Sequence, residues 1–337
     1  MIFSTAAQFD AALAALPAPD NRAMAGARAH QAQLTKPAGS LGRLEEMAIF
    51  LAGWQGREKP AIERGHAIVF AGNHGMTVHG VSAYPPAVTV QMVANFQAGG
   101  AAINALARAA GLELQIVPIE LDRPTQDFTV APAMSEAECL AALSIGAQAV
   151  QPGMDLVLLG EMGIGNSTAA AALAARSFGG MASDWVGPGT GLDHAGVDRK
   201  IAVIDRALAL HGDAPHMPIE TLRRVGGREI AAIAGAVLRA RQLGIPVMLD
   251  GFICCSAVAP LAAAVPAITD HCIAGHCSAE PGHDRLLRHL TLDPLLRLGM
   301  RLGEGSGGAV AVQMLRSALA AHNGMATFAQ AGVSGAA

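Results

Sequence analysis

Aromatic residues make up only 4% of this 337-residue chain, and charged residues only 15%. The net charge of −4 at pH 7 argues against a nucleic-acid or anionic-membrane partner, because neither would be attracted electrostatically. No apolar run is long enough for a membrane-spanning helix, since the stretch 253–268 is interrupted by Pro260 and Pro266. Hydrophobic residues nevertheless reach 52%, so the sequence predicts a sizeable buried core and no membrane segment.

Cysteine is also scarce, with five residues and no CxxC pair. An odd count without such a pair argues against a disulfide framework and favours a reducing compartment. The amino-terminal segment MIFSTAAQFDAAL contains Asp10 and no basic region, so it lacks the pattern of a signal peptide. We therefore expect a cytoplasmic protein, whose length allows one large domain plus a smaller one.

The order of apolar runs predicts an α/β fold. Residues 1–60 are rich in alanine and leucine, and Ser40 is expected to cap a helix with an apolar stripe formed by Leu41, Leu44, Met47 and Leu51. The expected strands are 66–72, 113–119, 155–161, 245–251 and 267–275. The expected helices are 87–110, 136–149, 167–177, 196–210, 227–242 and, after a break at 303–308, the tail within 293–330. Strands that alternate with helices in this way form a mostly parallel sheet flanked by helices.

Polar residues follow four of the expected strands at the point where each strand ends. They are Asn73 and His74, Glu161, Asp250, and His276 with Ser278. Ligands of an open parallel sheet bind beyond the carboxyl ends of its strands. We therefore expect these residues to share one cleft.

The segment GEMGIGNSTAAAAL (160–173) combines a glycine turn with an alanine-rich helix. Glycines let a ligand approach the backbone closely, and Asn166 or Ser167 is placed to cap the helix. The start of a helix favours a phosphate. The segment matches neither GxxxxGK[ST] nor GxGxxG, which argues against a nucleoside-triphosphate or NAD site. The alternative interpretation is an ordinary tight turn between a strand and a helix.

Two further glycine runs carry charged residues. The run VGPGTGLD (186–193) precedes a helix that contains Lys200, so it holds either a ribose or phosphate group or forms a flexible loop before a solvated helix. The run LGEGSGGA (302–309) places Glu304 between glycines. The glycines are expected to leave this carboxylate open to a ligand, with a pKa tuned for proton transfer. The alternative for this run is an exposed, helix-breaking loop.

Histidines and cysteines gather in DHCIAGHCSAEPGHD (270–284), which suggests a metal site at first sight. His271 and Cys272 are adjacent, however, and neighbouring residues of a strand face opposite sides. This spacing is poor for zinc. We therefore expect no bound metal.

Seven segments together resemble the nicotinate-nucleotide:dimethylbenzimidazole phosphoribosyltransferase family, in the family's order and over nearly the whole chain. They are KPAGSLGRLE (36–45), FAGNHGMTVHGVSAYPPAVTVQMV (70–93), GEMGIGNSTAAAAL (160–173), VGPGTGLD (186–193), LDGFICCSA (249–257), GHCSAEPGH (275–283) and LGEGSGGAVAV (302–312). The tail QAGVSGAA (330–337) departs from the family pattern. The resemblance implies one family-length unit, 1–337, and a homodimer without metal or cofactor. Within the unit it implies a Rossmann-like domain at about 61–290 and a small helical domain made of about 1–60 with 293–330.

The resemblance also implies an activity and roles for residues. Such enzymes move the phosphoribosyl group of nicotinate mononucleotide to 5,6-dimethylbenzimidazole, in the assembly of the lower ligand of cobalamin. Glu304 would be the catalytic base and Glu161 the second carboxylate. Ser82 and Gln91 would line the benzimidazole pocket. Residues around the nucleotide and cleft would be Gly163, Gly165, Asn166, Ser167, Thr168, Lys200, Asp250 and Ser278.

Two rival functions remain open from the sequence. One is a different phosphoribosyl or nucleoside transferase that acts on another heterocycle. The other is a binding protein that senses ribose phosphates without turnover. Glu304 separates the enzymes from the sensor, because a sensor has no use for a base beside the acceptor nitrogen.

Overall fold

The computed structural model describes residues 1–334, and their centre is a parallel sheet. Within this range the sheet has five strands in the order β2-β1-β3-β4-β5, and every neighbouring pair is parallel. The strands are β1 Gly65–Ala71, β2 Glu113–Pro118, β3 Leu156–Met162, β4 Val247–Leu249 and β5 Cys272–Ala274. Each lies inside or within one residue of an expected strand, so the predicted α/β fold with a parallel sheet is confirmed.

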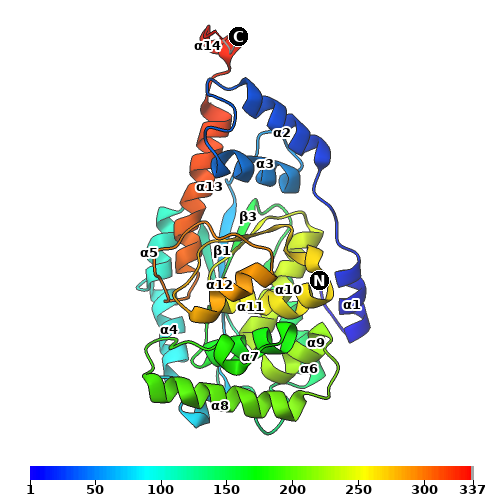
Figure 1. Ribbon diagram of the computed structural model, residues 1–337, viewed down its shortest axis with the longest axis vertical. Helices are drawn as coiled ribbons and strands as arrows, with labels where there is room; N and C mark the ends of the chain where they lie inside the picture. Colours follow the sequence, from blue (N-terminus) through cyan, green and yellow to red (C-terminus); the bar gives the residue numbers. More distant parts are fainter. Residues whose placement is uncertain (335–337) are drawn as a thin grey trace.

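The described helices cover both faces of this sheet (Figure 1). They are α1 Ala6–Ala14, α2 Asn21–Gln33, α3 Arg43–Gln55, α4 Ala87–Ala98, α5 Ala102–Ala109, α6 Glu136–Ala149, α7 Asn166–Phe178, α8 His194–His211, α9 Pro218–Val225, α10 Arg228–Gln242, α11 Phe252–Ala264, α12 Pro281–His289, α13 Ser306–Gly324 and α14 Phe328–Ala331. Short 3₁₀ turns add Gly75–His79, Ala182–Asp184 and Pro266–Thr269. Within residues 1–334 no helix is long and apolar enough to cross a membrane.

Alternate side chains of each strand belong to two separate cores. In β1, Ile68 and Phe70 join the core formed with α6, α7, α10 and α11, whereas Val69 joins the core formed with α3, α5 and α13. The same alternation in β3 places Val157 and Leu158 in opposite cores. Strands that are buried on both faces read as continuous apolar runs, which is why β1, β3, β4 and β5 could be recognised in the sequence. The edge strand β2 is partly exposed and was recognised instead by its alternation of polar and apolar residues.

Several helix predictions need correction. The expected helix 87–110 is split into α4 and α5, because Gly99 adopts a left-handed conformation with φ of +81°. Helix α3 begins at Arg43 after Gly42, so Ser40 does not cap it. The tail is not helical before Ser306, since Leu295 and Leu296 donate backbone hydrogen bonds to Ala274 and Gly275 beside β5.

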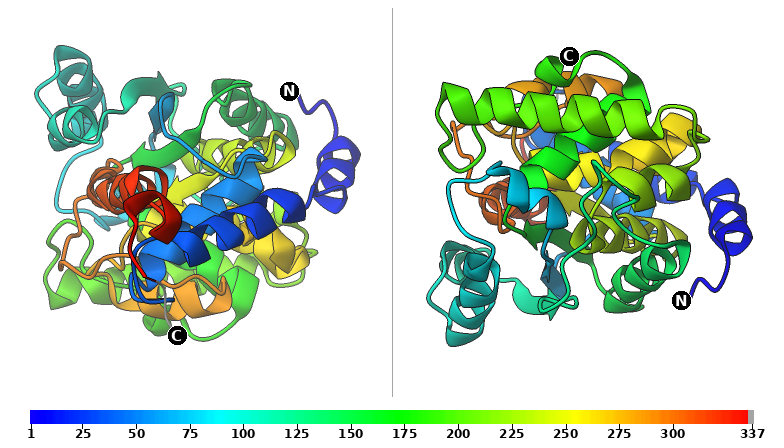
Figure 2. Two further views of the ribbon diagram at one scale, coloured as in Figure 1. Left: turned by 90° about the horizontal axis from the view of Figure 1, so that it is seen from above. Right: turned by 90° about the horizontal axis from the view of Figure 1, so that it is seen from below.

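Helices from both ends of the chain meet at one end of the molecule, where α2 and α3 lie beside α13 (Figure 1). Gln31 of α2 and His322 of α13 are 2.8 Å apart at their side-chain nitrogens. Helix α1 instead lies on the α/β body, at the edge of both views in Figure 2, and the Phe3 N–H donates to Ser144 of α6. The division into domains remains a prediction. Of the departing tail, 335–337 lie outside the described residues.

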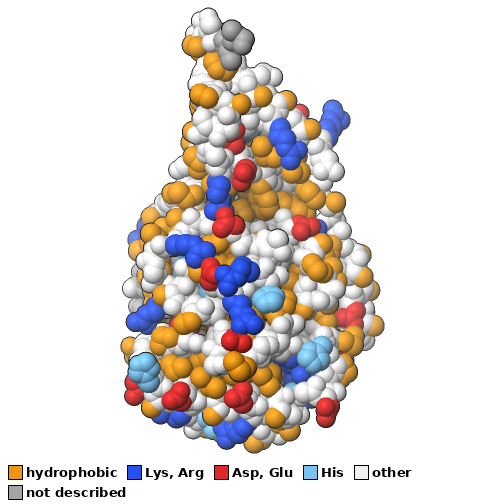
Figure 3. Space-filling view, viewed as in Figure 1, with side chains coloured by type: hydrophobic (Ala, Val, Ile, Leu, Met, Phe, Trp, Pro, Cys, Tyr) orange, Lys and Arg blue, Asp and Glu red, His pale blue; other side chains and the backbone are white. Residues whose placement is uncertain are grey.

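The surface reflects the low charge content of the chain. On the face shown in Figure 3, positive and negative side chains alternate in a band down the middle, and apolar and uncharged groups make up most of the rest. A cleft on such a surface depends on a few well-placed charges for its electrostatic character.

Candidate active site

A cleft of about 780 Å³, including its open mouth, lies at the carboxyl ends of β3, β4 and β5. Polar side chains at or just after these strand ends line it, namely Glu161, Asp250, His276 and Ser278. Three of the four expected strand ends therefore meet in one cleft.

The end of β1 does not join this lining, contrary to expectation. His74 is fully buried, and its Nε2 lies 2.6 Å from Glu229 Oε1. Asn73 donates instead to the Leu121 carbonyl. A Cβ on Gly163 would come within 2.8 Å of the same Glu229 oxygen, so the buried pair lies behind the glycine turn and supports it. Its role at the cleft is therefore indirect.

The glycine turn after β3 begins α7 without a side-chain cap. Gly165 is the N-cap with φ of +93°, and neither Asn166 nor Ser167 caps the helix as expected. The Asn166 amide donates to Glu161 Oε2 instead. Ser167 lines the cleft, whereas Thr168 is fully buried and does not. The turn presents the positive end of a 13-residue helix to the cleft, which favours an anionic ligand.

Lys200 of α8 supplies a cation at this point. Its Nζ donates to Ser167 Oγ at 2.9 Å and to the Gly187 carbonyl at 3.1 Å. Burial lowers the pKa of Lys200, and the nearby Glu280 carboxylate opposes that shift. Arg301, which sequence analysis did not single out, also lines the cleft and donates to the Gly189 carbonyl at 2.9 Å. A hydroxyl and two cations thus converge beside the start of α7.

Glu161 is the buried carboxylate at the centre of the cleft. Burial raises its pKa to about 8, and the carboxylates of Asp250 and Glu304 act in the same direction, while the bond from Asn166 opposes the shift. A Cβ on Gly303 would touch Glu161 Oε1, so only glycine fits beside it. A buried carboxylate with so strongly shifted a pKa is typical of catalytic sites.

Asp250 also holds the start of α13 in place. Its carboxylate accepts the backbone N–H groups of Gly305 at 3.2 Å and Gly308 at 2.7 Å. These donors belong to the first turn of a helix and would otherwise be unsatisfied. Asp250 therefore joins the end of β4 to the loop that carries Glu304, in addition to lining the cleft.

Glu304 is buried rather than open, with 5% of its surface exposed, which overturns both the expected accessible carboxylate and the exposed-loop alternative. Its Oε2 accepts the Ile103 N–H at the start of α5, 3.4 Å away, and its side chain is not part of the cleft lining. Burial raises the pKa of Glu304, and the Asp250 carboxylate adds to this rise. Gly303, next to it in the chain, does line the cleft.

The two residues expected to line the benzimidazole pocket, Ser82 and Gln91, differ in their position relative to the cleft. Ser82 lines the cleft, and its Oγ accepts the Tyr84 N–H at 3.2 Å. Gln91 is exposed on α4 and does not line it. The cleft wall also includes apolar side chains that sequence analysis did not assign, namely Val81, Ile164, Leu192, Phe252 and Leu302.

Ser278 is fixed from behind by His283. The Ser278 N–H donates to His283 Nδ1 at 2.8 Å, and its Oγ lies 2.9 Å from the same nitrogen. Burial lowers the pKa of His283 to about 3, and His276 adds to this effect. The neutral imidazole of His283 therefore orients the turn at Ser278, because its accepting nitrogen, Nδ1, is already bonded to the Ser278 backbone N–H.

The histidine- and cysteine-rich segment forms hydrogen bonds within the protein. His271 Nε2 lies 3.0 Å from the Val237 carbonyl, and His283 Nε2 lies 3.4 Å from Cys255 Sγ. Over residues 1–334 there is no group of three or more His, Cys, Asp or Glu side chains that could hold a metal ion.

Comparisons with known proteins agree with this geometry. A family model described as phosphoribosyltransferase matches residues 16–333. The nicotinate-nucleotide–dimethylbenzimidazole phosphoribosyltransferase of Novosphingobium aromaticivorans is 69% identical over 331 residues and 98% of each chain, and that of Ruegeria pomeroyi is 59% identical over 328 residues and 97% of each. A crystal structure of CobT from Thermus thermophilus has a TM-score of 0.87 at 41% identity, covering 94% of this chain and 100% of that one. The chain therefore belongs to the nicotinate-nucleotide–dimethylbenzimidazole phosphoribosyltransferase family.

Proposed function

We propose that this chain transfers the phosphoribosyl group of nicotinate mononucleotide to 5,6-dimethylbenzimidazole, giving α-ribazole 5′-phosphate, nicotinate and a proton. The product is the precursor of the lower ligand of cobalamin. The observation that carries the proposal, beyond family membership, is one cleft in which the Lys200–Ser167 pair and the buried Glu161 occur together. The first suits a phosphate and the second suits a developing ribosyl cation.

The phosphate of the donor would bind at the start of α7. Gly163 and Gly165 keep the turn free of side chains, and Ser167 and Lys200 offer a hydroxyl and an ammonium group. The helix dipole adds a favourable field for the dianion.

Glu161 would face the anomeric carbon. The nicotinate leaves with its bonding electrons, which neutralise its pyridinium nitrogen, so no general acid is needed. The remaining carbon passes through an oxocarbenium-like state that an ionised carboxylate stabilises. Asn166 donates to Glu161 and thereby favours the ionised form.

The acceptor attacks with one ring nitrogen from the opposite face, which converts the β to the α anomer, and its other nitrogen must lose a proton. Glu304 would take this proton. Because the Glu304 carboxylate faces Ile103 rather than the cleft, its side chain has to turn toward the cleft when the acceptor binds. Ser82, and Gln91 after a similar adjustment of α4, would complete the acceptor pocket.

Mixing the protein with nicotinate mononucleotide and a panel of heterocycles, followed by mass spectrometry of the products, tests the function directly. We expect 5,6-dimethylbenzimidazole to give α-ribazole 5′-phosphate. Faster transfer to a different heterocycle would favour the rival transferase. Binding of the nucleotide without any product would favour the sensor.

The role of Lys200 predicts a specific loss of donor binding. Lys200→Met keeps the apolar stem but removes the charge, so KM for nicotinate mononucleotide should rise by about 10- to 100-fold, as for a lost charged hydrogen bond. Steady-state kinetics measure this change, with the exposed Lys59→Met as the matched control. An unchanged KM, or a ligand-bound structure with the phosphate elsewhere, would contradict the assignment.

The poor metal-ligand spacing predicts that activity survives a chelator. We expect the transfer rate after dialysis against EDTA to equal that of an untreated sample. The measurement is the same product assay, repeated after adding back single divalent metals. Activity that disappears with EDTA and returns with one metal would refute the expectation.

Two further properties are proposed. One is a homodimer, which the resemblance to the family implies and which light scattering coupled to size-exclusion chromatography would measure. The other is a cytoplasmic location, which the cysteine pattern favours and which fractionation of the source cells would test.

A further inference from the structure

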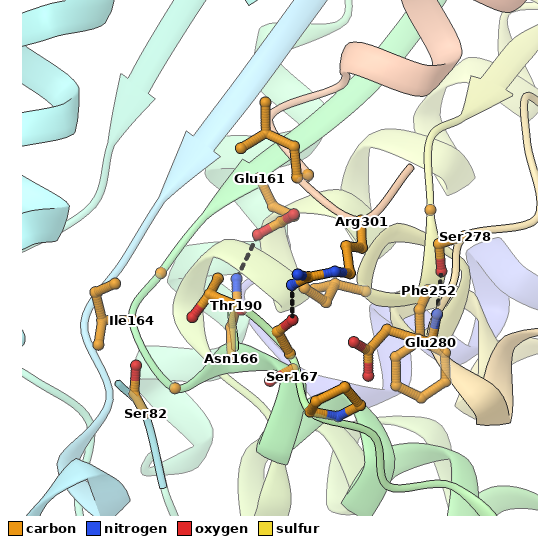
Figure 4. Close-up of a pocket in the computed structure, with 18 of the residues that line it drawn as sticks. Ser82, Glu161, Ile164, Asn166, Ser167, Thr190, Phe252, Ser278, Glu280 and Arg301 are labelled. Atoms are coloured by element: carbon orange, nitrogen blue, oxygen red, sulfur yellow. Dashed lines mark hydrogen bonds between the residues drawn. The ribbon is translucent and has the colours of Figure 1, made fainter. Parts of the chain in front are cut away.

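Glu280 is a buried carboxylate in the cleft to which the mechanism above gives no role. It stands at the N-cap of α12, yet it makes no side-chain cap bond. Only 8% of its surface is exposed, and neither carboxylate oxygen has a hydrogen-bond partner among the described residues. Figure 4 shows its carboxylate between Ser167 and Ser278, directed to the interior of the cleft.

The protein holds this side chain in place through the backbone around it. The Glu280 carbonyl accepts the His283 N–H at 3.0 Å, and the Glu280 N–H donates to Ser278 Oγ at 3.4 Å. Pro281 follows at the first position of α12 and limits backbone freedom. A Cβ on Gly187 would collide with Glu280 Oε2, so glycine at this position leaves room for the carboxylate.

A buried carboxylate without a well-formed hydrogen bond is unfavourable in the ligand-free protein. Burial raises the pKa of Glu280, and the Lys200 cation, the nearby Gly189 backbone N–H and the Arg301 cation oppose this rise. Within the part of the chain that the structure describes, these two cations donate instead to Ser167, Gly187 and Gly189. Groups that are poorly satisfied in the free protein and face a cleft are candidates for ligand contacts.

Because an ionised carboxylate only accepts hydrogen bonds, the chemistry of the missing partner of Glu280 can be inferred. The ligand must donate hydrogen bonds, and at neutral pH nicotinate mononucleotide has only two such groups, the 2′- and 3′-hydroxyls, because its carboxylate and phosphate are anions. Glu280 also lies near the phosphate end of the cleft, since Gly187 contacts both its carboxylate and the Lys200 ammonium. The dimethylbenzimidazole N–H is the competing donor.

We propose that Glu280 accepts hydrogen bonds from the ribose 2′- and 3′-hydroxyls of the phosphoribosyl donor and makes the enzyme selective for ribose over deoxyribose. The inference rests on the proposed function of the cleft. An acidic side chain binds the ribose hydroxyls of dinucleotides in the same way. A site built to bind a hydroxyl rejects an analogue that lacks it, because the buried acceptor is then left unpaired.

The test compares kcat/KM for nicotinate mononucleotide and its 2′-deoxy and 3′-deoxy analogues, with dimethylbenzimidazole as acceptor. The unaltered protein should prefer the ribose substrate over at least one analogue by about 10- to 100-fold. In Glu280→Ala this preference should shrink to within about threefold, mainly because the ribose substrate becomes worse. Glu113→Gln, an exposed carboxylate on β2 outside the cleft, should leave the preference unchanged.

A second measurement separates binding from folding. Glu280→Gln removes a buried charge that has no partner, so its midpoint of thermal unfolding without ligand should equal or exceed that of the unaltered protein. A large decrease in the midpoint would show a structural role and overturn the proposal.

The kinetic outcomes also separate this proposal from the proposed function. Product formation by the unaltered protein tests the function alone. If the unaltered protein is active but Glu280→Ala keeps the full preference for ribose, the proposal is wrong. An equal loss on all three donors, together with a raised KM for the benzimidazole, would assign Glu280 to the acceptor N–H and also overturn it.

Discussion

Glu304→Gln should lower kcat for transfer to dimethylbenzimidazole by roughly 10²–10⁴-fold, the usual contribution of one general base. The amide keeps the size of the side chain and can still accept the Ile103 N–H, so the local structure should be retained. It cannot take a proton from the acceptor. KM for nicotinate mononucleotide should stay nearly unchanged, because the proton comes from the other substrate.

Steady-state kinetics with both substrates varied would measure these effects, and Glu113→Gln again serves as the matched control. A near-normal transfer rate in Glu304→Gln would remove this residue from the mechanism. In that case Glu161, which lines the cleft, would be the candidate base.

A crystal structure with dimethylbenzimidazole bound would show how the acceptor reaches Glu304. We expect the Glu304 side chain to turn toward the cleft, so that the carboxylate exchanges the Ile103 N–H for the acceptor N–H. The bond to Ile103 is 3.4 Å long, near the upper limit for a hydrogen bond, and is therefore a weak restraint on such a movement.

Strands β1, β3, β4 and β5 could be predicted because burial on both faces leaves a continuous apolar run, whereas the partly exposed edge strand β2 was marked by alternating polar and apolar residues. The helices were harder to predict where contacts with the rest of the fold, and not the local sequence, determine the structure. Helix α11 contains Pro260 and is buried almost all round, so it has no polar face to give the sequence a helical period. The extended segment at Leu295 and Leu296 depends on backbone bonds to β5, which are not encoded in its own pattern.

The rule that ligands bind at the carboxyl ends of parallel strands predicted many residues that line the cleft, but not those that come from its loops. It placed Glu161, Asp250 and Ser278 correctly, because parallel strands bring their carboxyl ends to one edge. Glu280 and Arg301 come from loops whose course no local periodicity reveals. Glu280 did have one signal: it lies in the matching GHCSAEPGH segment, directly before the proline that begins α12.

Glu161→Gln should slow the transfer by roughly 10²–10³-fold, the range for losing one preorganised electrostatic contact to a transition state. The proposed role of Glu161 is to stabilise the ribosyl cation, whichever nucleophile then arrives. Hydrolysis of nicotinate mononucleotide without an acceptor should therefore slow as well. Glu304→Gln should affect mainly the transfer, since it acts on the benzimidazole proton.

The pH profile gives an independent check on Glu161. Only the ionised carboxylate can stabilise a cation, and burial raises its pKa in the free protein to about 8, so the protonated form prevails at pH 7. Because kcat/KM reports groups of the free enzyme, it should rise with pH up to about 8 and then level off. In Glu161→Gln the rise of kcat/KM that follows ionisation of Glu161 should disappear. Only the rise that follows ionisation of Glu304 should remain, and the pKa of Glu304 is also raised by burial. An unchanged profile in Glu161→Gln would mean that another group controls the pH dependence and that Glu161 does not need its charge.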